Sequence, residues 1–536
     1  MKYDILIIGS GGAGLSAALR AKEEGASVLV VSEGYPTRSQ TSMAQGGING
    51  ALGNVDDDSV LSHVEDTLRA SANLASKKMV ESLCEDALES IKWLESIGVP
   101  FSRTKDSKIA QRRLGGASNK RACYSQDYTG LKILHTLYDQ TLKDEIDFLH
   151  EHFLLKLSVE NNQINGAVFY DIRDGKIIHI KAKSVILATG GYGGIYYGAT
   201  TNTNQSTGDG IVAALKAGAK LSNIEFIQFH PTGLKDSGIL ISESARGAGG
   251  KLVNSKGERF VDELSPRDEV SRAIWQELEK GEDVFLDIRH LGEEFIDENI
   301  PQERKLCLTY AGVDPVSELI PIMPVAHYSM GGIWVDENMM SSIDGLFCAG
   351  ECANAHVHGA NRLGGNSLLE IVSFGSKAGI YAYEYAKEKV FADIKGDFVV
   401  ESKSYIEKIL ESKTDMNFYE QREYLGKLFY THSGIIKEEK LLQHALGEIE
   451  KNQEMLDSMG VVDHGNIYNT NLIERIKFEN MLNLSKVMIL SALSRKESRG
   501  AHYRKGYPKK EKSYEKESIA TLNKNDIKIY FQEVLS

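Results

Sequence analysis

The order of apolar and polar positions predicts alternating strands and helices at the start of the chain. Residues 3–8 form a short apolar run that predicts a buried parallel strand, and a glycine-rich turn follows it directly. Residues 15–24 have helical character, and residues 27–31 form a second apolar strand. This order of strand, turn, helix and strand is typical of a βαβ unit that opens an α/β fold.

In the rest of the chain the spacing of apolar residues changes several times. Apolar residues recur at helical spacing over 56–98, whereas residues 152–185 alternate around turn signals and predict antiparallel strands. Residues 235–325 have a mixed pattern that indicates an inserted domain. Long amphipathic helices are predicted over 380–495, and the Lys-rich residues 500–536 are interpreted as a solvated tail.

Composition limits the possible classes of function. The chain has 536 residues, of which 42% are hydrophobic and 26% charged, as expected for a globular protein of roughly two to four domains. Its formal net charge of −13 argues against a broad nucleic-acid surface, so we expect no nucleic-acid partner. No apolar run is long enough to cross a bilayer, and the first residues enter a strand without a targeting segment. We therefore expect a cytoplasmic protein.

The five cysteines do not form a recognisable metal-binding or redox motif. Cys84, Cys123, Cys307, Cys348 and Cys352 are scattered, and none belongs to a C-x-x-C pair. We therefore predict no metal site and no iron–sulfur cluster in this chain. The cysteines are interpreted as small buried hydrophobic residues.

The glycine-rich turn has the G-x-G-x-x-G spacing of a dinucleotide-binding site. Gly9 permits the tight turn, Gly11 allows the backbone to approach a pyrophosphate, and Gly14 allows close packing of helix and strand. The following helix offers free N–H groups to the phosphates at its N-terminus. Glu33 stands 19 positions after Gly14, where an acid accepts hydrogen bonds from ribose hydroxyls.

Two later apolar strands also end in glycine motifs, which favours FAD over a nicotinamide cofactor. Residues 185–191 end in Ala-Thr-Gly-Gly, and residues 346–351 end in Gly-Glu. FAD is long and needs contacts from several strand ends of one sheet. We predict that Thr189, Gly190 and Glu351 bind the cofactor, although either motif alone is compatible with an ordinary turn.

Basic and polar residues accumulate in later segments of the chain. The segments 230–233, 242–247, 265–268, 326–332 and 358–368 include the histidines at 230 and 327, a threonine at 232 and at least two arginines. Arginine forms bidentate hydrogen bonds with carboxylates. This inventory therefore suits a small dianionic substrate.

Together these motifs resemble the flavoprotein subunit of succinate dehydrogenase and fumarate reductase. They are the fingerprint at 9–14, SQTSMAQGG at 39–47, HPTG at 230–233, PRD at 266–268, HYSMGG at 327–332, GANRLGGNSLLE at 359–370 and SRGAH at 498–502, in the family's order. The resemblance implies an α/β fold with four parts. These are a Rossmann-like FAD-binding domain at 1–234 and 325–385, an inserted α+β capping domain at 235–324, a helical domain at 386–499 and an extended tail at 500–536.

The resemblance also implies roles for individual residues. The positions that hold the two substrate carboxylates are matched by His230, Thr232, His327 and Arg362. Arg267 matches the residue that exchanges a proton with the substrate carbon, and Glu243 and Arg246 match a relay that connects it to solvent. Further FAD contacts are implied for Ser39, Gln40, Thr41, Gln45, Gly46, Gly47, Asp209, Ser367 and Leu368. Hydride would pass between a substrate carbon and flavin N5, interconverting fumarate and succinate.

One departure from the family concerns attachment of the cofactor. Many members carry a histidine, covalently bonded to the flavin, where this chain has Gln40. Glutamine cannot form that bond, so we predict non-covalent FAD with a lower reduction potential. A lower potential favours fumarate reduction over succinate oxidation. The alternative is attachment through another residue.

The resemblance implies partner subunits as well. The chain has no cluster ligands or quinone-binding helices of its own, so an iron–sulfur subunit would carry electrons and a membrane anchor would meet quinone. We expect the protein to lie at the inner face of the cell membrane, held there by these partners.

Two alternatives are compatible with parts of this pattern. L-Aspartate oxidase, a relative with most of the same clamp, places a Glu before paired glycines to meet the amino group of its substrate, whereas this chain has Leu114. Leu114 offers no partner to an ammonium group, which favours the dicarboxylate enzyme. A flavin-binding subunit without catalytic activity is disfavoured by the complete set of His230, Arg267, His327 and Arg362.

Overall fold

A seven-stranded sheet forms the centre of the computed structural model, which describes residues 1–392, 395–524 and 526–536. Its order is β6-β2-β1-β9-β8-β7, and β16 pairs with the end of β9. The strands are β1 (Lys2–Ile8), β2 (Val28–Val31), β6 (Asp147–Leu149), β7 (His152–Glu160), β8 (Gln163–Asp171), β9 (Ile177–Leu187) and β16 (Leu346–Cys348). β8 is antiparallel to both of its neighbours, β7 and β9, which confirms the predicted antiparallel strands, and the other pairs are parallel.

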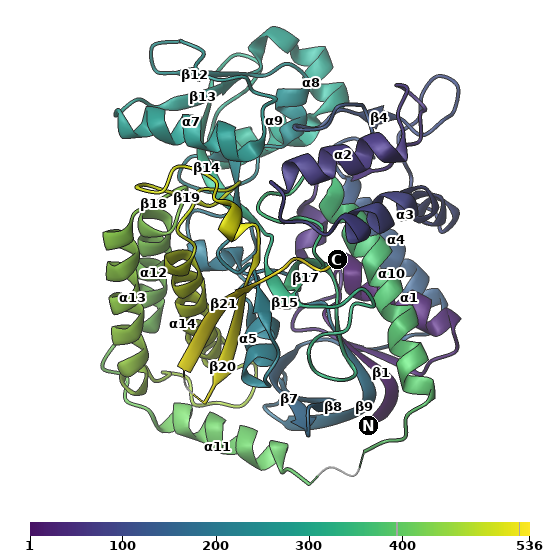
Figure 1. Cartoon of the computed structure of the whole chain (residues 1–536), viewed down its shortest axis with the longest axis vertical. Coiled ribbons are helices and arrows are strands. Elements are labelled where there is room, and N and C mark those ends of the chain that lie inside the picture. The colour runs from purple at the N-terminus through teal and green to yellow at the C-terminus, as the bar shows by residue number, and fades with distance from the viewer. Residues whose placement is uncertain (393–394, 525) are drawn as a thin grey trace.

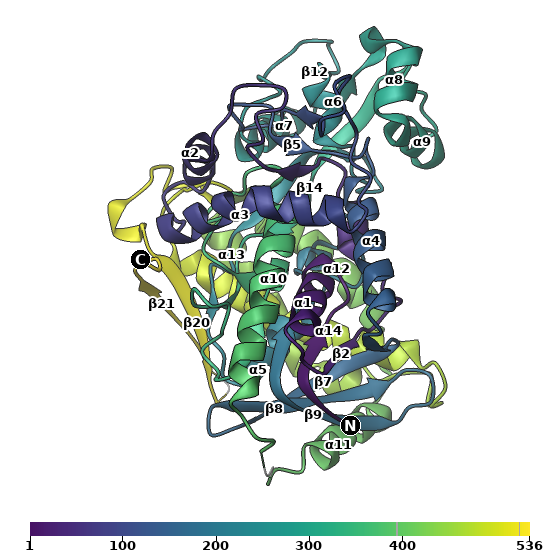
Figure 2. The same cartoon turned by 90° about the vertical axis from the view of Figure 1, so that its right-hand side faces the viewer.

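Helices α1 (Gly12–Glu23) and α10 (Asn366–Lys387) lie side by side against this sheet (Figure 2). The two helices can approach closely because Gly375 and Gly379 of α10 have no side chain at the contact. A Cβ at these positions would lie 2.7 and 2.3 Å, respectively, from a backbone oxygen of α1. Gly9 has a φ of +113°, and a Cβ on Gly14 would lie 2.0 Å from the Gly9 oxygen. Glycine at both positions therefore permits the turn and the close approach of α1 to β1.

The remaining helices and short strands of this domain surround the sheet. The predicted helices over 56–98 are confirmed as α2 and α3. The elements are α2 (Val60–Ala70), α3 (Lys77–Ser96), α4 (Thr129–Lys143), α5 (Asp209–Lys216), β3 (Ile48–Asn49), β4 (Gln111–Arg112) and β5 (Ala122–Cys123).

A second unit with its own core lies at the top of Figure 1, where the sequence predicts the capping domain. Its sheet has the order β11-β14-β13-β12, with β11 (Ile227–Leu234), β14 (Ile320–Ser329), β13 (Val284–Asp287) and β12 (Lys251–Asn254). Its helices are α6 (Glu243–Gly247), α7 (Arg267–Glu279), α8 (Glu293–Asn299) and α9 (Pro301–Tyr310). β11 and β14 are the long strands that connect this unit with the central domain.

In the C-terminal part the predicted helices are confirmed, whereas the predicted tail contains strands. The helices are α11 (Phe398–Glu411), α12 (Phe418–His432), α13 (Glu439–Glu454) and α14 (Thr470–Ser494). Residues 505–513 are exposed, but β20 (Glu517–Asn523) and β21 (Asp526–Gln532) form a hairpin. β20 pairs with β10 (Leu221–Ser222), in a sheet that continues through β15 (Gly332–Trp334) and β17 (Ala353–Asn354). The predicted solvated tail is therefore partly ordered by a sheet, and short strands β18 (Ile436–Lys437) and β19 (Tyr503–Arg504) precede it.

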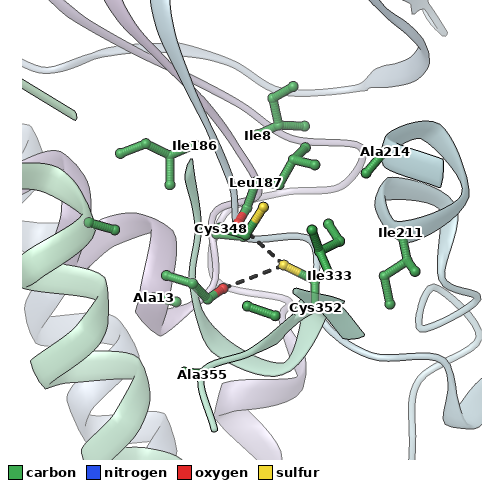
Figure 3. Close-up of a cluster of buried hydrophobic side chains, with 14 of the residues drawn as sticks. Ile8, Ala13, Ile186, Leu187, Ile211, Ala214, Ile333, Cys348, Cys352 and Ala355 are labelled. Carbon is green, nitrogen blue, oxygen red and sulfur yellow. Dashed lines mark hydrogen bonds between the residues drawn. The ribbon is translucent and has the colours of Figure 1, made fainter. Parts of the chain in front are cut away.

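All five cysteines are buried and free, which confirms their interpretation as small hydrophobic residues. Figure 3 shows Cys348 and Cys352 among apolar side chains such as Ile186 and Ile333. The Cys352 thiol donates a hydrogen bond to the Leu187 oxygen over 3.2 Å. In the described residues, no helix combines the length and apolar character needed to cross a membrane.

Candidate functional site

One continuous cavity extends from the turn after β1 to strands β11 and β14. The predicted cofactor residues that line it are Gly9, Gly11, Glu33, Ser39, Gln40, Thr41, Gln45, Gly46, Gly47, Thr189, Gly190, Asp209, Glu351, Ser367 and Leu368. The predicted substrate and proton-transfer residues that line it are His230, Glu243, Arg267, His327 and Arg362. Gly14, Thr232 and Arg246 lie behind lining residues, which they contact. The fold thus brings two sets of predicted residues, far apart in sequence, into one site.

The cofactor part of the cavity offers helix ends and unsatisfied polar groups. α1 begins at Gly12 and α10 at Asn366, and in both helices the residue before the first turn is a glycine without a capping side chain. The Gly12 N–H donates to Thr41 Oγ1 over 3.1 Å, and the Asn366 N–H donates to the Leu363 backbone oxygen over 3.3 Å. The N–H groups that follow them in each first turn are available to phosphate or another electron-rich group. Ser39 Oγ, Gln45 Oε1 and Thr189 Oγ1 are buried with no hydrogen-bond partner in the described part of the chain. Buried polar groups are normally paired, so these atoms fit a long polar ligand such as FAD.

Gln40 is held by the loop that follows the predicted Ala-Thr-Gly-Gly motif. Its Nε2 donates to the Thr201 oxygen over 3.3 Å, and its Oε1 accepts from the Thr203 N–H over 3.0 Å. Glu351 accepts a hydrogen bond from the Ser329 N–H over 2.9 Å, and burial raises its pKa to about 7. Both side chains line the cavity in fixed positions.

Two of the three predicted acidic residues of the cofactor site contact helix α14. Glu33 forms an ion pair with Lys477. Asp209, the first residue of α5, accepts a hydrogen bond from Asn480 Nδ2 over 2.7 Å. Sequence reasoning did not find Lys477 or Asn480, because they lie in a helix that carries no recognised motif.

Two neutral histidines face each other in the substrate part of the cavity. The rings of His230 on β11 and His327 on β14 have centroids 5.0 Å apart. His230 Nδ1 accepts from the Thr232 N–H over 3.2 Å, which leaves Nε2 as the donor of the neutral ring. Thr201 Oγ1 lies 2.8 Å from His327 Nδ1. Burial, followed by neighbouring positive charge, lowers the pKa of both histidines well below its usual value, so both are neutral at pH 7.

Arg267, Glu243 and Arg246 form a buried row of alternating charges. Arg267 Nη2 and Nε lie 2.5 and 3.2 Å from Glu243 Oε2, and Arg246 Nη2 lies 3.5 Å from Glu243 Oε1. Burial alone would raise the pKa of Glu243, but the two guanidinium groups outweigh it and lower the pKa to about 2. The Arg246 side chain is 0% exposed, and its Nη1 donates to the backbone oxygen of Glu263 over 2.6 Å. The three predicted residues are therefore adjacent, although Arg246 itself does not reach the surface.

Gln228 is a site residue that sequence reasoning missed. It is fully buried on β11, and its Oε1 accepts hydrogen bonds from Arg267 Nη1 and Arg362 Nη2, each over 3.0 Å. Its Nε2 donates to Asn361 Oδ1 over 2.8 Å, which fixes the orientation of the amide. The only sequence signal was a polar residue inside the apolar run 226–229. One amide oxygen thus orients both guanidinium groups.

We expect Gln228→Leu to lower kcat/KM for the dicarboxylate substrate by about 10- to 100-fold, because two charge-assisted hydrogen bonds are lost. Steady-state kinetics of the purified variant measure this. Gln443→Leu, at an exposed position of α13, is the matched control. Unchanged kinetics for Gln228→Leu would show that Arg267 and Arg362 do not depend on their hydrogen bonds to Gln228.

The side chain of Arg362 has a second neighbour that the sequence did not reveal. Its guanidinium lies 4.3 Å from the centroid of the Tyr328 ring, and the Tyr328 hydroxyl donates to Glu370 Oε2 over 2.9 Å. Burial, followed by the charge of Arg267, lowers the pKa of Arg362 to about 10. Arg362 is therefore protonated at pH 7 and held between an aromatic face and an amide. Leu114 also lines the cavity and contributes no charge there.

Comparison with protein families gives matches along most of the chain. Residues 4–368 match a family model described as an FAD binding domain. Residues 422–535 match a model described as the fumarate reductase flavoprotein C-terminal domain.

Individual relatives agree with these matches. The chain is 40% identical to the 8-methylmenaquinol:fumarate reductase flavoprotein subunit of Wolinella succinogenes, over 97% of this chain and 89% of that one. It is 38% identical to the succinate dehydrogenase flavoprotein subunit of Rickettsia bellii, over 95% of this chain and 90% of that one. A solved structure of E. coli quinol fumarate reductase superposes with a TM-score of 0.96 at 35% identity, covering 100% of this chain and 97% of that one.

Proposed function

Because the chain belongs to the family of succinate dehydrogenase and fumarate reductase flavoprotein subunits, we propose that it interconverts fumarate and succinate. The observation that carries the proposal is the substrate part of the cavity. Two guanidinium groups and two neutral imidazoles converge there beside an ionised carboxylate. A buried cluster of this kind binds a small dianion with both charges paired.

FAD is the cofactor that fits the rest of the cavity. The fingerprint glycines and the N-terminus of α1 would hold the pyrophosphate, Glu33 the ribose, Glu351 the ribitol, and the N-terminus of α10 the flavin ring. When bound, FAD supplies a centre that takes up or gives a hydride equivalent.

The residues of the chain then have separate roles. Arg362, His230 and His327 donate hydrogen bonds to the two carboxylates of the substrate, and Thr232 fixes the tautomer of His230. This grip orients the reacting carbon, an effect that accounts for several kcal/mol of a barrier. Arg267 gives a proton from a guanidinium nitrogen to the neighbouring carbon during fumarate reduction. Glu243, 2.5 Å from Arg267 Nη2, then takes up a proton passed through Arg246 and gives it to Arg267, which restores the guanidinium and leaves Glu243 ionised again.

We infer that FAD is bound without a covalent link, since Gln40 occupies the position of the flavin-linking histidine. The amide of Gln40 is engaged by the 201–203 loop and has no nucleophilic atom to offer. We expect acid precipitation to release all the flavin into the supernatant, and the denatured chain to have the mass of the bare polypeptide. A chain heavier by one flavin would contradict this. The missing bond lowers the reduction potential, which favours fumarate reduction as the working direction.

Two competing functions are less well supported. Oxidation of aspartate requires a partner for its ammonium group, and Leu114 at the cavity wall provides none. A catalytically silent flavoprotein has no need for the buried Arg267–Glu243 pair, which is costly to desolvate.

We also propose that the chain works within a larger complex. The relatives named above include a quinol fumarate reductase and a succinate dehydrogenase flavoprotein subunit, and the described residues hold no cluster of metal-binding side chains. An iron–sulfur subunit and a membrane anchor would then connect the flavin with quinone. Such partners would hold the chain at the inner face of the cell membrane.

The proposal is tested by turnover with three substrates. Purified protein with FAD should oxidise a reduced dye with fumarate and should reduce a dye with succinate more slowly. Aspartate should give no hydrogen peroxide. Hydrogen peroxide formed from aspartate, with no turnover of fumarate, would show that the chain is an L-aspartate oxidase instead.

A further inference from the structure

Lys477 is a buried cation at the edge of the FAD site. It lies on α14 in the helical domain, and its side chain is 2% exposed. Its ammonium group forms an ion pair with Glu33 and lies 3.5 Å from Glu474. Glu474 in turn pairs with Arg422 of α12, which is 5% exposed. An ordered row of alternating charges thus leads from the cavity into the helical domain.

Asn480 presents a second contact from the same side of α14. It lies three residues after Lys477, so both side chains project from one face of the helix. Asn480 Nδ2 donates to Asp209 Oδ1 over 2.7 Å, and α14 packs against α5, where Asp209 is the first residue (Figure 1). Glu33 and Asp209 line the cavity, whereas Lys477 and Asn480 stand behind them. One helix therefore holds both acids at this end of the cavity.

Two carboxylates at this end of the cavity need such support. A pyrophosphate held by the fingerprint glycines would lie in the same cavity, and like charges in a poorly solvated site repel one another. Burial raises the pKa of Glu33, whereas Glu33 and Glu474 raise the pKa of Lys477 against the effect of its own burial. Without an ammonium group beside it, Glu33 would take up a proton or turn toward water. Either change would remove a fixed charged acceptor from the position of the ribose.

We propose that Lys477 is a positioning residue of the FAD site, which pairs with Glu33 and so fixes the group that meets the ribose hydroxyls of the adenosine half. The proposal rests on FAD as the cofactor of this cavity. Ribose hydroxyls both donate and accept hydrogen bonds, so the essential property is a held and neutralised pair at positions 33 and 477. The helical domain then contributes to cofactor binding through Glu33.

Ligands that represent the two halves of FAD separate this role from mere support of the fold. Binding of FAD, ADP and FMN to the full chain freed of flavin is measured by titration calorimetry. We expect Lys477→Met to bind FAD and ADP about 10- to 100-fold more weakly, the range for losing one charged hydrogen-bond partner. FMN, which lacks the adenosine half, should bind within about threefold of its original affinity. Lys486→Met, on the same helix but paired with Glu450, is the matched control and should bind all three ligands normally.

Exchange of the two charges provides the second test. Lys477→Glu should weaken FAD and ADP binding further, because it places three carboxylates together. The double variant Glu33→Lys/Lys477→Glu should recover at least tenfold of that loss. If Lys477→Met is not recovered in folded form, the double variant and Lys477→Glu, isolated with FAD present, are compared by flavin retained per chain after gel filtration.

Three results would overturn the proposal. They are unchanged FAD and ADP affinity in Lys477→Met, an equal loss of FMN affinity, and a double variant no better than Lys477→Glu. If the original chain binds FAD tightly in each of these cases, the proposed function stands and only the role of Lys477 fails. If the original chain binds no FAD, the proposed function itself fails.

Discussion

Replacement of Arg267 by glutamine is expected to lower kcat for fumarate reduction by about 10³-fold, within the range for loss of a general acid. Arg267 has the two partners that such a role needs. Glu243 contacts its Nη2 and Nε, and Gln228 contacts its Nη1. Glutamine keeps some polar contact with these partners but has no proton to give at the substrate carbon.

The Arg267→Gln result requires binding controls. FAD content and the affinity for a non-reacting dicarboxylate should stay within a few-fold of the original, since Arg362 and the histidines still hold the carboxylates. Arg289→Gln, which removes a partly exposed arginine paired with Asp287 in the same domain, is the matched control and should be silent. A kcat within tenfold of the original would assign the proton transfer to another group.

Replacement of Arg362 by methionine is expected to act mainly on substrate binding. A buried carboxylate would lose a charged donor worth about 1.5–3 kcal/mol per hydrogen bond, so we expect KM for fumarate to rise about 100-fold. Lysine should rescue little, because it cannot reproduce the planar fork that Gln228 and Tyr328 hold in place. Steady-state kinetics and a dicarboxylate titration measure both variants.

Titration of Arg362 should also make KM for fumarate depend on pH. The pKa of Arg362, lowered to about 10, means that its charge is complete at pH 7 and is lost as the pH rises through about 10. KM should therefore be constant near neutrality and rise above pH 9, while Arg362→Met should lack this rise. A KM that increases between pH 6 and 8 would instead indicate a titrating histidine, against the neutral state of His230 and His327.

Local patterns predicted the fold where each element is defined by its own residues. The strand, glycine turn and helix at 3–24, the helices over 56–98 and the antiparallel strands over 152–185 all depend on periodicity that a short window contains. The hairpin of β20 and β21 could not be found in this way. Its sheet is completed by β10, about 300 positions earlier, and the Lys-rich residues before it suggested a solvated segment.

The residues of the site were likewise predicted in part and missed in part. Residues inside recognisable motifs, such as His230, Arg267 and Arg362, were predicted by resemblance, and the fold places them around one cavity. Gln228 and Lys477 were missed because their significance comes only from contacts. Lys477 meets Glu33 across 444 positions of sequence, a distance over which no spacing rule operates.

A single turnover shows whether the bound flavin passes its electrons to fumarate in this site. The purified chain with FAD is reduced chemically without oxygen, freed of reductant and mixed with fumarate, and flavin absorbance and product are followed. We expect rapid return of the oxidised flavin spectrum with one succinate formed per flavin, and no such return with Arg267→Gln on the same timescale. Reduced protein that stays reduced in the presence of fumarate, although its FAD is fully bound, would show that this flavin does not reduce fumarate.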